Sequence, residues 1–359
     1  MLAVRVVAKG LLGQGEDGRD LVGGFSGNPH GPAPGDGGTR RASVRRAARA
    51  AGLRLTPARA IATVTADPGR ISCRRPASKL ARRAAPHLPE NSMNSYRVGI
   101  AGFGAIGQAV AQSLDAGLPG LTLAAVAVRD PKAAPAVAWQ NATPVFTTIG
   151  ELAEHCDVVV ECAPAAVFRE LAEPVLKAGK KLVVLSSGAL LRHDDLIELA
   201  RRHQGQILVP SGAILGLDAI TAAAEGEIHS VTMITRKPVR GLLGAPYLTD
   251  NNIDIDGITE PRLIFRGSPR EAAVGFPANL NVAVSVSLAG IGPDRTTLEI
   301  WADPSLERNV HRVEVVSDSA SFSMEIQNIP SANPKTGRIT AQSVIAALRK
   351  LTGPLRVGT

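Results

Sequence analysis

The chain has 359 residues, of which 45% are hydrophobic, and its formal net charge is +8. This length and apolar content are enough for two ordinary domains. The first 92 residues hold 16 Lys and Arg against 6 Asp and Glu, whereas residues 93–359 hold 24 against 26. The basic excess is therefore confined to the first quarter, and the remainder has no electrostatic footprint for nucleic acid. No apolar run reaches the roughly 20 residues of a membrane helix.

The three cysteines Cys73, Cys156 and Cys162 lie far apart or in unlike contexts. They form neither a metal-ligand spacing nor an even disulfide framework, so we expect no metal site. Free cysteines of this kind favour a reducing compartment, and the cytoplasm is the expected location.

Residues 1–92 are rich in Gly, Ala, Pro and Arg, with no sustained apolar period. Such a composition cannot bury enough apolar surface to offset chain entropy. We interpret this segment as a disordered extension, or as sequence upstream of a true start at Met93. An Arg-rich organelle transit peptide is a third interpretation, although acidic residues near the start argue against it.

A strand, a glycine-rich turn and a helix follow one another from Tyr96 onward. Residues 96–101 are apolar enough for a buried strand, and a helical pattern runs to Leu114. Between them the first glycine permits a tight turn, the second lets the backbone approach a pyrophosphate, and the third lets the helix pack close to the strand. The predicted cofactor-binding residues in this turn are Gly102, Gly104, Ala105, Ile106 and Gly107.

A second strand is expected over residues 121–128, and Arg129 and Asp130 follow it directly. At this point a dinucleotide-binding fold carries an acidic residue for the ribose hydroxyls of NAD, or a basic one for the 2′-phosphate of NADP. Both types are adjacent here. Arg129 is therefore a candidate cofactor contact, and the choice between NAD and NADP stays open.

Apolar strands continue to alternate with helices up to Ala213. The expected strands span residues 145–148, 157–163, 181–190 and 206–213, and the expected helices span residues 148–156, 167–178 and 194–203. This alternation predicts a Rossmann-type, doubly wound parallel sheet over residues 93–213, with ligands at the carboxyl ends of its strands. Cys162 falls at that edge, where we interpret it as a small buried apolar residue rather than a nucleophile.

The pattern changes after Ile220. Partly alternating strands are expected at residues 230–238, 262–268, 296–304, 310–318 and 321–329, with helices at residues 269–274 and 281–289. Strands with helices segregated to one side predict an α+β substrate and dimerisation domain over residues 214–330. An amphipathic helix at residues 339–350 is expected to pack back on the first domain, so residues 331–359 form a C-terminal segment.

A series of motifs identifies a resemblance to a known family. They are, in order, GFGAIG (102–107), ECA (161–163), SSGAL (186–190), SGAILGLDA (211–219), TRKP (235–238), FPANLNVA (276–283), ADPSLERNVH (302–311) and NPKTG (333–337). The series resembles the L-aspartate dehydrogenases and covers residues 96–350. The resemblance implies a homodimer that uses NAD or NADP to oxidise L-aspartate to iminosuccinate, which water converts to oxaloacetate and ammonia. The reverse amination, and a role in NAD biosynthesis, are also implied.

The resemblance also assigns roles to individual residues. The catalytic histidine falls on His311, and the nicotinamide contacts fall on Ala213 and Asn281. Asn281 starts a predicted helix and has an alternative role as its N-cap, although Asn279 is placed for that role too. Leu215 and Gly337 depart from the family pattern, at positions where a small residue and a serine are expected, and this puts the substrate in question.

A dicarboxylate substrate requires cations, and the candidates are Arg236, Lys237 and Lys335. A group that titrates near neutrality is needed beside the amine, and histidine fits that need. Of the seven histidines, only His311 has a supporting motif.

Other functions stay open. The same architecture serves homoserine dehydrogenase and dihydrodipicolinate reductase relatives, although their substrate-domain motifs are not found here. A non-catalytic NAD(P) sensor would keep the fold without the chemistry. Binding to nucleic acid rests on the basic segment 1–92 alone.

Overall fold

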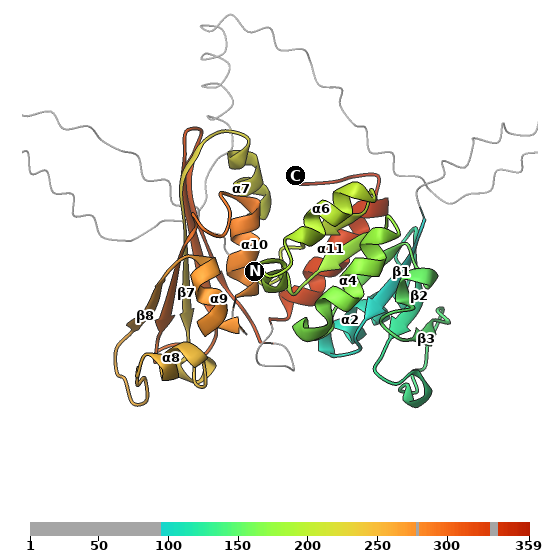
Figure 1. Cartoon of the computed structure of the whole chain (residues 1–359), viewed down its shortest axis with the longest axis horizontal. Coiled ribbons are helices and arrows are strands. Elements are labelled where there is room, and N and C mark those ends of the chain that lie inside the picture. The colour runs from blue at the N-terminus through green and yellow to red at the C-terminus, as the bar shows by residue number, and fades with distance from the viewer. Residues whose placement is uncertain (1–94, 278–279, 331–336) are drawn as a thin grey trace, which may run out of the picture. The chain divides into compact units, whose positions relative to one another are not determined.

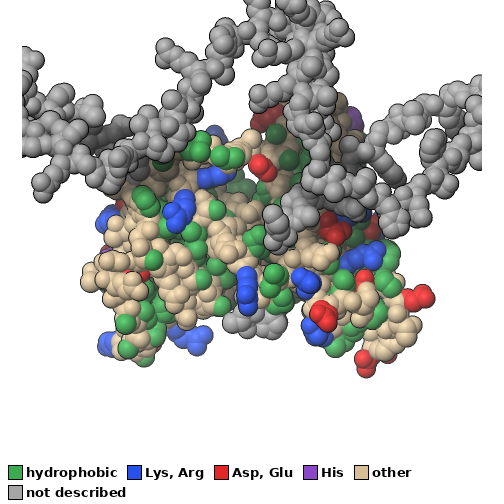
Figure 2. Space-filling view, turned by 180° about the vertical axis from the view of Figure 1, so that it is seen from behind, with side chains coloured by type: hydrophobic (Ala, Val, Ile, Leu, Met, Phe, Trp, Pro, Cys, Tyr) green, Lys and Arg blue, Asp and Glu red, His purple; other side chains and the backbone are tan. Residues whose placement is uncertain are grey.

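The computed structural model describes residues 95–277, 280–330 and 337–359. The expectations for residues 1–92 and for Lys335 lie outside these ranges. Within them, no helix has the length and apolar character needed to cross a membrane. On the face seen in Figure 2, positive and negative side chains are interspersed over the described residues, as their balanced composition implies.

Six parallel strands form the first sheet, and this confirms the predicted dinucleotide-binding fold. The strands are β1 (Tyr96–Ala101), β2 (Leu121–Ala127), β3 (Val145–Thr147), β4 (Val158–Glu161), β5 (Lys181–Val184) and β6 (Gln206–Leu208). Their spatial order is β3-β2-β1-β4-β5-β6. The direction of winding reverses between β1 and β4, and the crevice outside such a reversal is where ligands bind in sheets of this kind.

Helices cover both faces of this sheet. They are α2 (Ala105–Asp115), α3 (Leu152–His155), α4 (Phe168–Lys177), α6 (Asp195–Arg202) and α11 (Ile339–Thr352). One face buries Phe168, Leu171 and Leu196 against the sheet. On the other face Val344 and Leu348 of α11 share a core with Val110 of α2, so the C-terminal helix lies against the first sheet (Figure 1).

A second sheet has five strands in the order β11-β10-β7-β9-β8. They are β7 (Ile228–Lys237), β8 (Arg262–Gly267), β9 (Thr297–Ala302), β10 (Val310–Ser317) and β11 (Ser321–Gln327). The pair β7 and β9 is parallel, and the other neighbours are antiparallel. Helices α7 (Leu217–Ala224), α9 (Pro269–Gly275) and α10 (Asn281–Ala289) lie on one face of it (Figure 1), which confirms the predicted α+β arrangement.

The structure differs from the expected elements at several places. The strand expected over residues 206–213 ends at Leu208, and the helix expected over residues 148–156 spans only Leu152–His155. The strand expected over residues 181–190 ends at Val184, and Ser187–Leu190 forms the short helix α5. Two helices were not predicted, α7 and α8 (Pro246–Asp250). Among the described residues, 3₁₀ turns also lie at η1 (Pro131–Ala133), η2 (Ala165–Val167) and η3 (Val239–Gly241).

Candidate active site

The glycine turn between β1 and α2 has the shape of a cofactor cradle. Gly102 has a φ of +93°, and a Cβ there would lie 2.6 Å from the carbonyl oxygen of Cys162. A Cβ on Gly107 would overlap the carbonyl oxygen of Gly102, whereas one on Gly104 would meet nothing within 4 Å. The chain itself therefore requires the first and third glycines. The second faces open space, at the start of a helix whose first amides have no partner within the helix.

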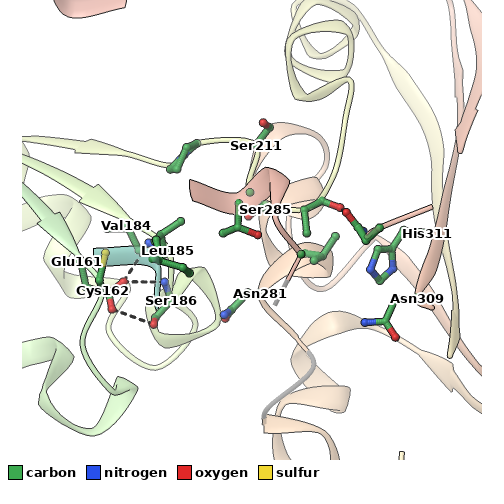
Figure 3. Close-up of a pocket in the computed structure, with 18 of the residues that line it drawn as sticks. Glu161, Cys162, Val184, Leu185, Ser186, Ser211, Asn281, Ser285, Asn309 and His311 are labelled. Carbon is green, nitrogen blue, oxygen red and sulfur yellow. Dashed lines mark hydrogen bonds between the residues drawn. The ribbon is translucent and has the colours of Figure 1, made fainter. Parts of the chain in front are cut away.

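A cavity of about 250 Å³ opens beyond this turn, at the carboxyl edge of the first sheet. One side is lined by residues that follow the parallel strands, among them Glu161, Ser186 and Ala213. The other side is lined by residues of the second sheet and its helices, among them Asn281 and His311 (Figure 3). A ligand in this cavity would therefore contact both parts of the fold.

Glu161 is a buried carboxylate at the edge of this cavity, with 1% of its surface exposed. One carboxylate oxygen accepts hydrogen bonds from the backbone amides of Leu185 (3.0 Å) and Ser186 (2.7 Å), and the other accepts from Ser186 Oγ (3.0 Å). Burial raises the pKa of this carboxyl, and the hydrogen bonds from Ser186 oppose that rise. These bonds turn the chain out of the sheet after Val184, which explains why the expected strand stops there.

The turn after β5, which is hydrogen-bonded to Glu161, is also hydrogen-bonded to the start of α10. Ser187 Oγ donates to the carbonyl oxygen of Asn281 (2.6 Å), and Ser285 Oγ donates to Ser187 Oγ (3.1 Å). The amide of Gly188 donates to Asn281 Oδ1 (3.0 Å). The N-cap position of α10 is Leu280, so Asn281 does not cap its own helix, and the alternative role considered for it is wrong. Its side chain instead joins the two parts of the fold.

His311 lies inside the cavity on β10, with 4% of its surface exposed. Its Nδ1 is 3.2 Å from Thr235 Oγ1 of the neighbouring strand β7. Burial, together with the nearby charge of Lys237, lowers the pKa of His311 to about 3. The expectation that this histidine titrates near neutrality is therefore not met in the protein alone, because burial disfavours the charged ring. The imidazole is neutral at physiological pH and has a lone pair with which to accept a proton.

Lys237 ends β7 and lines the same cavity, with 6% of its surface exposed. Burial lowers the pKa of its ammonium group to about 8. A buried ammonium group has lost the hydration that it would have in water. An anionic ligand beside it stabilises its charge, so such a cation attracts an anion strongly.

A second cavity, of about 580 Å³, adjoins the first. Lys237, Asn309, Asn328 and Gly337 line both cavities. Arg240 lines only the second, and its guanidinium donates to the carbonyl oxygen of Glu307 (2.9 Å). Arg308 and Glu307 line the second cavity as well, so two arginines and one acidic residue accompany Lys237 there.

The structure brings together five of the predicted cofactor, substrate and catalytic residues. Ile106, Ala213, Lys237, Asn281 and His311 all line the first cavity. Gly337 lines it as well. Ala105 is the first residue of α2, beside the glycine turn.

Other expected residues lie elsewhere. Arg236 stands over the ring of Trp301 (5.2 Å to its centroid) and pairs with Asp303 (3.4 Å), and it lines neither cavity. Arg129 is exposed just after β2, outside both cavities. Leu215 packs against the core of the second sheet, so it does not narrow the first cavity.

Cys162 lines the cavity, but burial raises the pKa of its thiol far above its usual value. A thiol of this kind is a poor nucleophile, in agreement with its interpretation as a small apolar residue. The described residues contain no group of three His, Cys, Asp or Glu side chains that would hold a metal ion.

Sequence reasoning missed Glu161, Arg240 and Asn328. Glu161 lies within a motif that was noted, ECA, but only its burial shows that it has a role. Arg240 follows TRKP by two residues, and the sequence analysis gave it no role. Asn328 directly follows a strand, and nothing in its local sequence distinguishes it from a surface amide.

Comparisons with known proteins agree on the kind of protein. A family model of the C-terminal part of aspartate dehydrogenase matches residues 218–351, and a model of the NAD-binding domain of homoserine dehydrogenase matches residues 102–210. The chain is 57% identical to the L-aspartate dehydrogenase of Bradyrhizobium diazoefficiens over 281 residues, which are 77% of this chain and 99% of that one. It is 58% identical over 271 residues to L-aspartate dehydrogenase 3 of Bordetella bronchiseptica, covering 75% of this chain and all of the relative.

Among solved structures, the aspartate dehydrogenase of Thermotoga maritima has a similar fold. The TM-score is 0.55 at 23% sequence identity, and the match covers 74% of this chain and 100% of that one.

Proposed function

This chain belongs to the L-aspartate dehydrogenase family, and we propose that it oxidises L-aspartate to iminosuccinate with NAD or NADP as the cofactor. Water converts iminosuccinate to oxaloacetate and ammonia, and the reverse amination uses the same site. The observation that carries this proposal is a neutral, buried histidine and a buried lysine that line one cavity, which Ile106 beside the glycine turn also lines.

The cofactor fits the residues present, because the space beside Gly104 is open while Gly102 and Gly107 are closed in by the chain. Gly102, Gly104, Ala105, Ile106 and Gly107 would hold its pyrophosphate, and Ala213 and Asn281 its nicotinamide end. Arg129 would contact the 2′-phosphate if the cofactor is NADP. When bound, the nicotinamide ring supplies the acceptor for the hydride that leaves the substrate Cα.

His311 is proposed to manage the proton of the reaction. Loss of a hydride from Cα and of a proton from the amine converts the C–N single bond of aspartate to the C=N bond of iminosuccinate. The neutral imidazole accepts that proton, with its ring oriented by Thr235. Carboxylates bound beside His311 raise its pKa, so its capacity to hold the proton increases when substrate is present.

Lys237 and Arg240 are proposed to bind the two carboxylates of the substrate. Lys237 lines both cavities and Arg240 only the second, so an anionic ligand can extend from one cavity into the other. The earlier candidate Arg236 is less suited to this role, because it lines neither cavity. Lys335 stays a candidate outside the described residues.

The assay that tests this function follows reduced nicotinamide by absorbance, with L-aspartate, L-homoserine and glycine as substrates and each of NAD and NADP. We expect turnover with L-aspartate, and none with glycine, which lacks the second carboxylate. Preference for L-homoserine would instead favour the related reductase, and cofactor binding without any turnover would favour the sensor.

We also propose a homodimer in the cytoplasm that contributes to NAD biosynthesis. The face of the second sheet opposite α7, α9 and α10 supports a dimer, since Leu263 and Val316 are about two-fifths exposed on its strands. Sedimentation equilibrium tests this state. A monomer at micromolar concentration would contradict it.

A further inference from the structure

Asn328 lies where the two cavities meet. It directly follows β11, and its backbone amide donates to the carbonyl oxygen of Asn309 (3.0 Å), two residues before His311. Its side chain is 6% exposed and lines both cavities. It is therefore a buried amide side chain beside the proposed catalytic histidine.

The orientation of this amide is fixed by one contact. Asn328 Nδ2 donates to the carbonyl oxygen of Ala213 (2.9 Å). A carbonyl oxygen can only accept, so the amide nitrogen must face Ala213, and Oδ1 must point away from it. In the described part of the chain, Asn328 Oδ1 is the one buried side-chain nitrogen or oxygen with no hydrogen-bond partner.

An unsatisfied buried acceptor destabilises a folded protein, and native structures contain few of them. Asn328 Oδ1 lies in the cavity proposed to bind the substrate, and Gly337 lies next to it. A Cβ at Gly337 would stand 3.1 Å from Asn328 Oδ1, so the glycine leaves the approach to the oxygen less crowded than a larger residue would.

We propose that Asn328 Oδ1 accepts a hydrogen bond from the α-amino group of the substrate. This assignment rests on the proposed aspartate dehydrogenase function. A carbonyl oxygen repels the two carboxylates, which Lys237 and Arg240 attract, so the amine is the part of the substrate that fits it. Asn328 thus holds the amine close to His311, the group that takes its proton.

The cofactor brings a second possible donor, the amide of its nicotinamide ring. The position of Asn328 favours the substrate, since Ala213 and Asn281 line only the first cavity whereas Asn328 also lines the second. Measuring cofactor binding in the absence of substrate shows which of the two donors contacts Asn328 Oδ1.

The test compares L-aspartate with succinate, which has the same two carboxylates and no amine. In the full-length chain with Asn328→Ala, we expect the KM for L-aspartate to rise about tenfold or more, as for a lost hydrogen bond to a charged group. The inhibition constant of succinate and the dissociation constant of NADH should each change less than about twofold. Gln327→Ala is the matched control, because Gln327 is exposed and lines neither cavity.

Each other outcome has a distinct meaning. Equal weakening of L-aspartate and succinate would overturn the contact to the amine, and weaker NADH binding with an unchanged KM would assign Oδ1 to the cofactor. Absence of L-aspartate turnover by the unaltered chain would overturn the proposed function itself. If thermal melting shows that Asn328→Ala does not fold, Asn328→Ser, whose hydroxyl is too short to replace Oδ1, serves for the same comparison.

Discussion

The side-chain hydroxyl of Ser187 donates a 2.6 Å hydrogen bond to the backbone carbonyl oxygen of Asn281. Ser187 follows a strand of the parallel sheet, and Asn281 begins a helix that packs on the second sheet. Because Glu161 holds the amides just before Ser187, the carboxylate, the turn and the amide of Asn281 form one continuous polar link. The link sets where Asn281 stands relative to the glycine turn.

This link predicts that Glu161 affects cofactor binding through Asn281. Glu161→Ala removes three accepted hydrogen bonds, and we expect the dissociation constant of NADH to rise about tenfold. In Glu161→Gln the amide oxygen still accepts from both backbone amides, so the dissociation constant should stay within about twofold of the original. Fluorescence titration of NADH measures each value.

A double-mutant cycle tests whether the effect passes through Asn281. If it does, Glu161→Ala combined with Asn281→Ala weakens NADH binding less than the two single effects would together. Additive effects would show that Glu161 acts independently of Asn281. A loss of turnover in Glu161→Gln with unchanged NADH binding would instead give Glu161 a part in proton transfer.

The glycine turn gives opposite expectations for two neighbouring substitutions. Gly104→Val places its side chain in open space, so the melting temperature should stay unchanged while NADH affinity falls at least about tenfold, since the side chain fills the proposed pyrophosphate site. Gly107→Val forces a side chain into the carbonyl of Gly102, and we expect a lower melting temperature or no folded protein. Calorimetry with NADH titration separates the two. Full NADH affinity in Gly104→Val would place the pyrophosphate elsewhere.

The lowered pKa of Lys237 leads us to expect that inhibition by succinate depends on pH. Burial lowers its pKa to about 8, so the ammonium form is present below that pH and is lost above it. Both carboxyl groups of succinate are ionised above pH of about 6. The inhibition constant should therefore be flat near pH 7 and rise above about pH 8, by up to about tenfold per pH unit.

Substitutions identify the titrating group. Lys237→Met should bind succinate weakly at all these pH values and lose the break near pH 8. Arg240→Ala should also bind succinate weakly but keep the break near pH 8. The arginine that it removes stays ionised throughout this range and does not cause the break, whereas Lys237 is still present. A break that persists in Lys237→Met would mean that another group titrates.

Much of the fold can be predicted from local sequence patterns. The strand and glycine turn from Tyr96 to Gly107 follow from apolar periodicity and glycine spacing, and the observed β1 and α2 agree with them. Helix α10 has the bounds expected from its sequence, Asn281–Ala289. These segments need no distant partner to define them.

The errors arise where distant residues decide the structure. Residues 185–190 continue an apolar strand pattern, but Glu161, some 24 residues earlier, captures the amides of Leu185 and Ser186 and ends the strand. Arg236 carries the charge a substrate would need, yet strand alternation turns it toward Trp301 and Asp303 while its neighbour Lys237 faces the cavity. Asn328 gains its importance only through burial and the carbonyl of Ala213.

The most direct measurement compares aspartate-dependent NAD(P) reduction by the full-length chain with that of His311→Ala. The control is His229→Ala, since His229 lies on β7 of the same sheet with its side chain half exposed. We expect His311→Ala to lower kcat by about a hundredfold or more, as for the loss of a general base, with NADH binding within about twofold. We expect His229→Ala to leave both unchanged. Undiminished turnover in His311→Ala would contradict its role as the proton acceptor, and no aspartate-dependent turnover by the unaltered chain would contradict the proposed reaction.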